Sequence, residues 1–305
     1  MTFFLIQGRQ FLNLASDNGD DSAAGAIAIY ADNVSLNHSS VNGVVTLDAD
    51  GSSDGAITIV TDTGNSGTLS SFSAWDDGLT ITSGTAATDL SGAALANLNA
   101  LNITASSVTI GATTTGSGGL SLTSTVGDIT IGGNLSTDGS GNAGTVALSK
   151  PLANAIVLSA DVVIDTDSPG LNNDADITLA GVQGLGSDRS ITLTAGSGDV
   201  NLSAAANTNI NNFTASGDLI TIGGAIVAGG TVSLTSTGAN SGNGDVSGSD
   251  AKVDVNAAIT AAQIQLSGVS NTEVPVIDVA GVALTTNGDT GSSTGQIILQ
   301  SNGVM

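Results

Sequence analysis

Short segments in which two branched aliphatic residues flank a single residue, most often threonine, recur along the whole chain. They run from Ile27-Ala28-Ile29 to Ile297-Ile298-Leu299, and those between begin at Val45, Ile57, Leu79, Val108, Ile129, Ile177, Ile191, Ile220, Val232 and Ile264. An extended strand places both aliphatic side chains of such a segment on one face. Gly, Asn, Asp or Ser, which form turns, bound the segments. No segment can bury its aliphatic face alone, so the strands must stack on one another.

This pattern predicts an all-β chain folded as a right-handed parallel β-helix, because crossovers between parallel strands are right-handed. The segments follow one another about every 7 to 15 residues, so two or three of them make one coil of about 20–25 residues. Some 12–15 coils, stacked roughly 4.8 Å apart, would form a rod of about 60–70 Å. We therefore expect residues 1–305 to form one elongated domain, with the aliphatic residues inside.

A longer repeat is found when the chain is compared with itself. At an offset of 112, positions 79–84 match 191–196, positions 108–111 match 220–223, and positions 120–125 match 232–237. One further match, 103–106 with 213–216, has an offset of 110. We expect a repeating unit of about 112 residues, spanning roughly 44–155, 156–267 and a partial 268–305, after a less regular start at 1–24. Matched residues should then occupy the same core positions several coils apart.

One stretch is ambiguous between helix and strand. Residues 89–102 carry leucines at helical spacing after an aspartate, which suits a short amphipathic helix. The matching residues 201–213 are rich in Asn and Thr, which disfavour helix. Equivalent segments should share a conformation, so both are predicted to be strand plus loop.

The charge of the chain excludes several partners. The formal net charge is −23, which argues against nucleic acid and against an anionic membrane surface. Glu273 is the only glutamate, so the other acidic residues are aspartates, which suit turns. The mean hydropathy of +0.29 excludes a disordered chain, and no apolar run approaches the length of a membrane span. The chain has no cysteine, so no disulfide or thiolate metal site is possible.

Three segments resemble the repeats of filamentous-haemagglutinin-like bacterial surface proteins: residues 127–133 (GDITIGG), 189–196 (RSITLTAG) and 198–202 (GDVNL). The resemblance implies an exported β-helix outside the bacterial cell or on its outer surface, acting in adhesion or as a structural stalk. Host or surface glycans, or other cell-surface polymers, are the partners it implies. The family's secretion domain carries Asn-Pro-Asn motifs, and this sequence has none. We therefore expect an interior fragment that continues into further repeats of a longer chain.

Groups suited to catalysis are few. His38 is the only histidine, and no nucleophile motif accompanies it. Asp76 and Asp77, beside Trp75, form the best carboxylate pair for glycoside hydrolysis, although a turn with a packed tryptophan is the simpler explanation. The basic residues, Arg9, Lys150, Arg189 and Lys252, are scattered. We predict no catalytic residue and no cofactor; the alternatives are a pectinase-like or lyase-like β-helix enzyme and a surface-layer-type protein.

Asp48, Asp50 and Asp54 resemble the opening of a calcium-binding loop. The position where an EF-hand places its bidentate glutamate holds Ile59. Two aspartate pairs, at 165 and 167 and at 174 and 176, are weaker candidates of the same kind. Solvated acidic turns are the simpler interpretation, so we predict no metal ligands and leave calcium open for the first loop.

Outward-facing threonines are the last surface feature. They are expected at 46, 58, 80, 109, 130, 178, 192 and 221. A flat threonine array would suit ice or a crystalline polysaccharide, but threonine is also what an exposed strand position prefers. Ice binding therefore stays an alternative.

Overall fold

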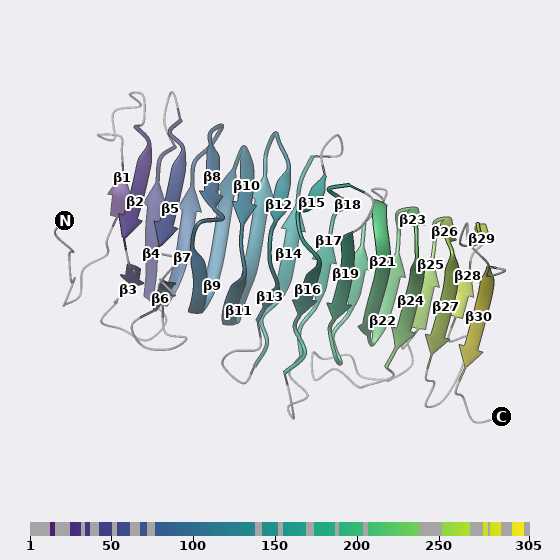
Figure 1. Cartoon of the computed structure of the whole chain (residues 1–305). Coiled ribbons are helices and arrows are strands. Elements are labelled where there is room, and N and C mark those ends of the chain that lie inside the picture. Colours follow the sequence, from purple (N-terminus) through teal and green to yellow (C-terminus); the bar gives the residue numbers. More distant parts are fainter. Residues whose placement is uncertain are drawn as a thin grey trace.

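A computed structural model describes residues 13–15, 25–31, 34–36, 43–50, 54–61, 68–71, 77–137, 142–151, 155–168, 174–186, 189–203, 207–237, 252–268, 277–279, 281–287 and 295–301. Every regular element in these ranges is a β-strand. The strands lie side by side from one end of an elongated molecule to the other (Figure 1). All their pairings are parallel, which confirms the predicted parallel β-helix.

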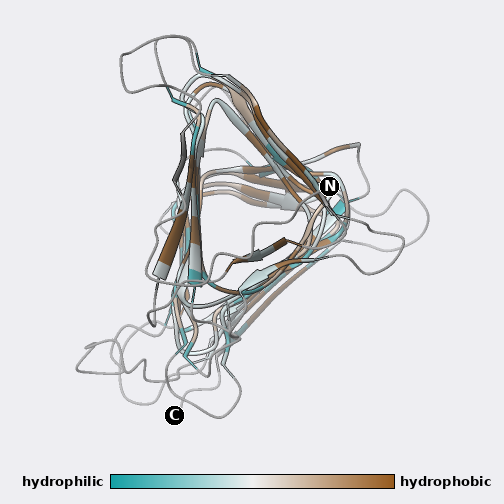
Figure 2. Ribbon diagram, turned by 90° about the vertical axis from the view of Figure 1, so that its left-hand side faces the viewer, coloured by the Kyte–Doolittle hydropathy of each residue, from teal (hydrophilic) through white to brown (hydrophobic). Residues whose placement is uncertain are grey.

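The strands form three flat faces, and Figure 2 shows the triangular outline that they enclose. Face 1 contains β1 (Asn13–Ala15), β4 (Gly43–Asp48), β7 (Asp77–Thr82), the second parts of β9 (Ala94–Ala105) and β11 (Thr113–Ser124), β14 (Val146–Ser149), β17 (Ile177–Leu179), β20 (Val200–Leu202), β22 (Leu219–Ile222), β25 (Lys252–Val255) and β28 (Ile277–Val279). Face 2 contains β2 (Ile27–Ala31), β5 (Ile57–Thr61), β8 (Ala87–Leu90), β10 (Ser107–Ile110), β12 (Ile129–Ile131), β15 (Ile156–Leu158), β18 (Val182–Gly184), the first part of β21 (Asn207–Gly217), β23 (Ile226–Ala228), β26 (Ile259–Ala261) and β29 (Leu284–Thr286). Face 3 contains β3 (Val34–Leu36), β6 (Thr68–Ser71), the first parts of β9 and β11, β13 (Leu135–Ser136), β16 (Val162–Asp165), β19 (Arg189–Thr194), the second part of β21, β24 (Thr231–Ser236), β27 (Gln263–Gly268) and β30 (Gln296–Ser301).

One coil therefore has three sides, each made of a strand and the corner that follows it. On face 1 the positions paired between successive coils are 19 apart at the shortest, from Leu101 to Leu120, and 34 apart at the longest, from Val45 to Leu79. The described strands make eleven coils, which at about 4.8 Å per coil give a length of roughly 50 Å. The described strands make fewer coils than the predicted 12–15, because many coils are longer than the strand spacing suggested.

The core is a column of small aliphatic side chains. In β19, Ile191 and Leu193 are almost completely buried, whereas the residues between and beside them point outward. The same alternation continues through one hydrophobic cluster that runs along the rod. Phe213 is the only aromatic side chain in that cluster among the described residues. A narrow interior of constant width explains the preference for Val, Ile, Leu and Ala.

The ambiguous stretch is extended, as predicted. Residues 89–102 contribute to β8 and to β9, and the matching residues 201–213 contribute to β20 and β21. β9 and β21 each continue around a corner, so that one strand contributes to two faces. In both, an asparagine at the corner has a positive φ, 57° at Asn97 and 55° at Asn209. Asparagine is among the few residues that adopt this conformation readily.

The two asparagines are related by the offset of 112, and other features recur at the same offset. The Thr125 hydroxyl donates to the Gly84 carbonyl at 3.5 Å, and the Thr237 hydroxyl donates to the Gly196 carbonyl at 2.8 Å. The Ser124 hydroxyl donates to the carbonyl of Ser106 at 2.7 Å. In the same way, the Ser236 hydroxyl donates to the carbonyl of Asp218 at 2.7 Å. Position 106 therefore corresponds to 218, and the alignment at an offset of 110 was wrong by two positions.

Matched residues are buried alike but lie on different faces. Leu79 is on face 1 and its counterpart Ile191 is on face 3. Val108 is on face 2 and its counterpart Ile220 is on face 1. Fourteen sides separate the members of each pair, because β9 and β11 span two sides each. Fourteen sides make four coils and two further sides, so the repeat turns by two thirds of a coil. The expectation of identical core positions was correct for burial and wrong for the face.

A charge in the core should unfold the rod locally. Leu122 of β11 is fully buried, so Leu122→Asp places an unpaired carboxylate in the aliphatic column and should cost several kcal/mol. Because coils contact only their neighbours, amide protection should be lost in β9, β11 and β14 and kept around β24. Hydrogen exchange measures both. Ser121→Asp, on the outward side of the same strand, is the control and should leave protection unchanged. Loss of protection along the whole chain would contradict local unfolding.

Candidate functional site

Aspartates at the corners accept hydrogen bonds from backbone N–H groups of the following coil. The acceptor–donor pairs are Asp54 with Thr85, Asp128 with Ala155, Asp161 with Ser190, Asp174 with Ser197, Asp176 with Asp199, and Asp199 with Leu219. Three asparagines likewise accept from amides of a neighbouring coil, namely Asn134 from Val163, Asn207 from Val182 and Asn212 from Thr231. These amides lie at corners or in the first two residues of a strand, where a short Asp or Asn side chain reaches them. This explains why the acidic residues are aspartates.

Asp174 is the most enclosed of these carboxylates, with 8% of its surface exposed. It accepts hydrogen bonds from the amide of Ser168 at 2.7 Å and from both the amide and the hydroxyl of Ser197 at 2.8 Å. Beside it lies Gly196, whose φ is +58°. A β-carbon on Gly196 would stand 2.4 Å from one Asp174 oxygen and 2.9 Å from an Asp167 oxygen. Two carboxylates therefore enclose this glycine from the preceding coil.

The same arrangement surrounds Gly84, which has a φ of +50°. A β-carbon there would stand 2.4 Å from an Asp54 oxygen and 2.7 Å from an Asp50 oxygen. Asp50 is itself held in a turn, because its amide donates to the Asp48 carboxylate at 3.0 Å. Gly84 follows a face 1 strand and Gly196 follows a face 3 strand. One corner structure is thus built twice, at two different edges of the rod.

These corners contain the loops that the sequence suggests for calcium. Their carboxylate oxygens accept from backbone amides, which identifies them as structural parts of the corner. In the part of the chain that the structure describes, no three Asp, Glu or His side chains gather closely enough to hold a metal ion. The aspartates at 165 and 167 and at 174 and 176 follow the same rule, since Asp165 accepts from the Asp167 amide at 3.0 Å. Calcium binding by the first loop stays an alternative, without a described ligand set to support it.

Of the histidine, the tryptophan and the carboxylate pair considered for catalysis, only Asp77 is among the described residues. His38, Trp75 and Asp76 lie outside the described residues. Asp77 is 1% exposed at the start of β7, and its carboxylate accepts from the Ser71 hydroxyl at 3.1 Å. The Ser71 hydroxyl oxygen in turn accepts from the Asp77 amide at 3.3 Å. These reciprocal bonds join the end of β6 to the start of β7.

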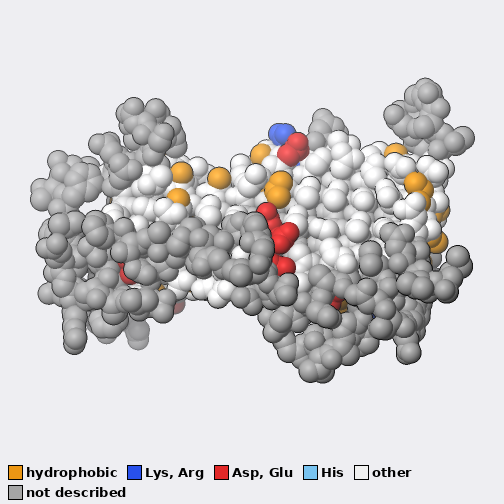
Figure 3. All heavy atoms as spheres, turned by 90° about the horizontal axis from the view of Figure 1, so that it is seen from below, with side chains coloured by type: hydrophobic (Ala, Val, Ile, Leu, Met, Phe, Trp, Pro, Cys, Tyr) orange, Lys and Arg blue, Asp and Glu red, His pale blue; other side chains and the backbone are white. Residues whose placement is uncertain are grey.

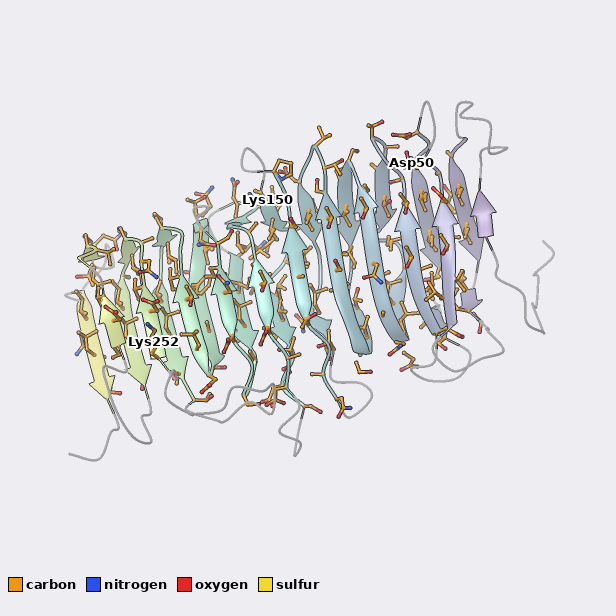
Figure 4. The ribbon with its side chains drawn as sticks, turned by 180° about the vertical axis from the view of Figure 1, so that it is seen from behind. Asp50, Lys150 and Lys252 are labelled. Atoms are coloured by element: carbon orange, nitrogen blue, oxygen red, sulfur yellow. The ribbon has the colours of Figure 1, made fainter. Side chains whose placement is uncertain are left out.

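The described basic residues lie apart from one another. Figure 4 shows Asp50 and Lys150 along one long edge and Lys252 nearer to the C-terminal end. Burial lowers the pKa of the Lys150 ammonium below its usual value, and the Asp128 carboxylate partly opposes this effect. Lys252 forms an ion pair with Asp254 at 3.5 Å. No cluster of cations suited to an anionic polysaccharide is present among the described residues.

The outward threonines do not form one array. Thr46 and Thr80 are neighbours on face 1, but the next residues in that row are Asn102, Ser121 and Ala147. Thr58, Thr109 and Thr130 are on face 2, and Thr192 is on face 3. Exposed aliphatic residues are spread along the rod, with several near its C-terminal end, whereas acidic side chains gather near the middle of the view in Figure 3. A flat surface suited to ice is therefore not formed by these threonines.

The described residues contain no helix that could cross a membrane. Comparisons with protein-family models, with curated proteins and with solved structures give no match for this chain.

Removal of the Asp174 carboxylate should destabilise two neighbouring corners. Asp174→Ala leaves the amides of Ser168 and Ser197 without their acceptor, which should lower the free energy of unfolding by about 1–3 kcal/mol. Asp89→Ala is the control, because exposed Asp89 bonds only to Ser91 within its own turn. Urea unfolding of the two variants tests the difference. Equal losses would show that the Asp174 bonds add nothing to stability.

A methyl group at the enclosed glycine should be more harmful than one at an open glycine. Gly196 and Gly186 both have positive φ, so alanine at either should cost about 1–2 kcal/mol from backbone strain alone. A β-carbon at Gly196 also collides with Asp174, whereas at Gly186 nothing lies within 4 Å. Gly196→Ala should therefore lower the melting temperature clearly more than Gly186→Ala. Equal melting temperatures would mean that the carboxylate moves aside freely.

Proposed function

We propose that this chain is a non-catalytic segment of a secreted or cell-surface repeat protein, acting as a structural stalk or in adhesion. The observation that carries the proposal is how the polar side chains are used. Aspartates and asparagines that could have formed a reaction centre instead accept backbone amides at the corners, coil after coil. A chain whose polar side chains bind one coil to the next is suited to form a long stalk.

Three further properties support an extracellular or outer-surface location. The net charge of −23 keeps a long rod soluble and repels anionic membrane surfaces. The aliphatic column is held together without any disulfide. The repeats at 127–133, 189–196 and 198–202 resemble those of filamentous-haemagglutinin-like exoproteins. Surface glycans or other cell-surface polymers are the partners that fit such a protein, through hydroxyl and amide side chains along the faces.

The enzymatic alternative has less support. A lyase or pectinase on this fold needs basic groups beside its carboxylates in order to bind an anionic sugar and move a proton. Lys150 and Lys252 lie at separate places on the rod, and the carboxylate of Asp77 is enclosed next to Ser71. No described group of residues favours hydrolysis.

The location and the absence of catalysis are tested together. Antibodies raised against the purified chain should label intact cells of the producing bacterium, and external protease should remove the signal while a cytosolic marker stays intact. The purified chain, incubated with pectin and with neutral glucans, should release no new reducing ends. Label that is found only after lysis would contradict the surface location. Sugar release that is lost on boiling the protein would contradict the non-catalytic role.

A further inference from the structure

The repeating unit has fourteen sides and each coil has three, so matched residues in the two copies of the unit lie on different faces. We infer that the three faces of this β-helix are interchangeable, so that one complete repeat unit can be removed although every strand after it moves to another face. This inference concerns how the rod is built and does not depend on the proposed function. It is carried by the local structure at matched positions, by the contacts that a shortened rod would make, and by the hydrogen bonds that both copies share.

The local structure at the matched corners is the same in both copies. The alternation of buried and exposed side chains from 95 to 101 is identical to that from 207 to 213. Asn97 and Asn209 have φ angles within a few degrees of each other. Yet the first corner joins face 3 to face 1, and the second joins face 2 to face 3. The local sequence, and not the face on which it lies, therefore determines the corner conformation.

Removal of residues 98–209 would join Asn97 to Ile210 and keep aliphatic residues in contact throughout. The second part of β21 would take the place of the second part of β9 against β7, with Phe213 beside Leu79 where Leu101 is now. β22 would take the place of β10 against β8, with Ile222 beside Leu90 where Ile110 is now. Each new neighbour is a buried side chain in the present rod. Only one turn of the coil would acquire new pairings, because β24, β25 and β26 keep their partners.

The corner hydrogen bonds would also be restored. In the shortened rod the Thr237 hydroxyl reaches the corner after β7, where the Gly84 carbonyl replaces that of Gly196. The Thr237 amide keeps its present acceptor, the Gly217 carbonyl, at 2.8 Å. Leu95 would stand beside Ile226 in place of the buried Asn207, so an aliphatic contact replaces a polar one.

The test compares two deletions in the full chain. Deletion of 98–209 leaves 193 of the 305 residues and moves all later strands to another face. The control, deletion of 101–199, joins Ala100 to Val200, which is on the same face as Leu101, and removes twelve sides, so every later strand keeps its face. Circular dichroism, small-angle scattering and hydrogen exchange are measured on both.

We expect the 98–209 deletion to give the same strand signal per residue as the full chain and a rod shorter by about 22 Å, with protected amides in β22 and β24. A folded control beside an unfolded 98–209 deletion would show that each strand depends on its own face and would overturn the inference. Loss of structure in both deletions would overturn it too, since matched sides would then not be exchangeable. A folded 98–209 deletion supports it whether or not the control folds.

Discussion

The structure depends on one constraint: the backbone hydrogen bonds of each strand are made to strands one coil away. A strand of three residues such as β12 cannot be stable alone, and it exists because β10 and β15 pair with it on either side. Parallel pairing in register places like residues above like residues, as with Ile129 between Val108 and Ile156. The aliphatic column and the constant width of the interior both follow from that register.

The corners are where this pairing is interrupted, and there the side chains replace it. An amide such as that of Ala155 has no strand partner, so the Asp128 carboxylate of the preceding coil accepts its hydrogen at 2.8 Å. A glutamate at such a position has one more methylene to fix and would displace the chain outward. The near absence of glutamate from a strongly acidic protein is therefore a result of corner geometry. Part of the negative charge of the rod therefore comes from the aspartates that accept backbone amides at its corners.

The sides of the rod were predictable from sequence, and their arrangement around the axis was not. Segments such as Ile191-Thr192-Leu193 identify strands because burial alternates with period two. The number of sides in a coil depends on which strands pair between successive coils, and corner loops of variable length hide that from any local pattern. The long repeat was visible in the sequence, but its rotation about the axis becomes apparent only once the coil is known.

The role of the aspartates was missed for a related reason, since the amide bound by Asp54 belongs to Thr85 in the next coil. An aspartate directly before a strand, as in Asp128-Ile129 and Asp176-Ile177, is the signal that could have indicated it.

The strands lie across the axis, and this has a mechanical consequence. Tension along the rod acts on the bonds between coils and not on the covalent chain, so the coils would separate one after another from an end. A coil of 19 residues adds only about 4.8 Å to the folded length, yet the same residues fully extended span about 65 Å. A coil that detaches and extends would therefore span more than ten times the length that it contributes to the folded rod. Under compression or bending the same coils rest on one another and stay short, so a rod that resists shortening also holds a large reserve of extensible chain.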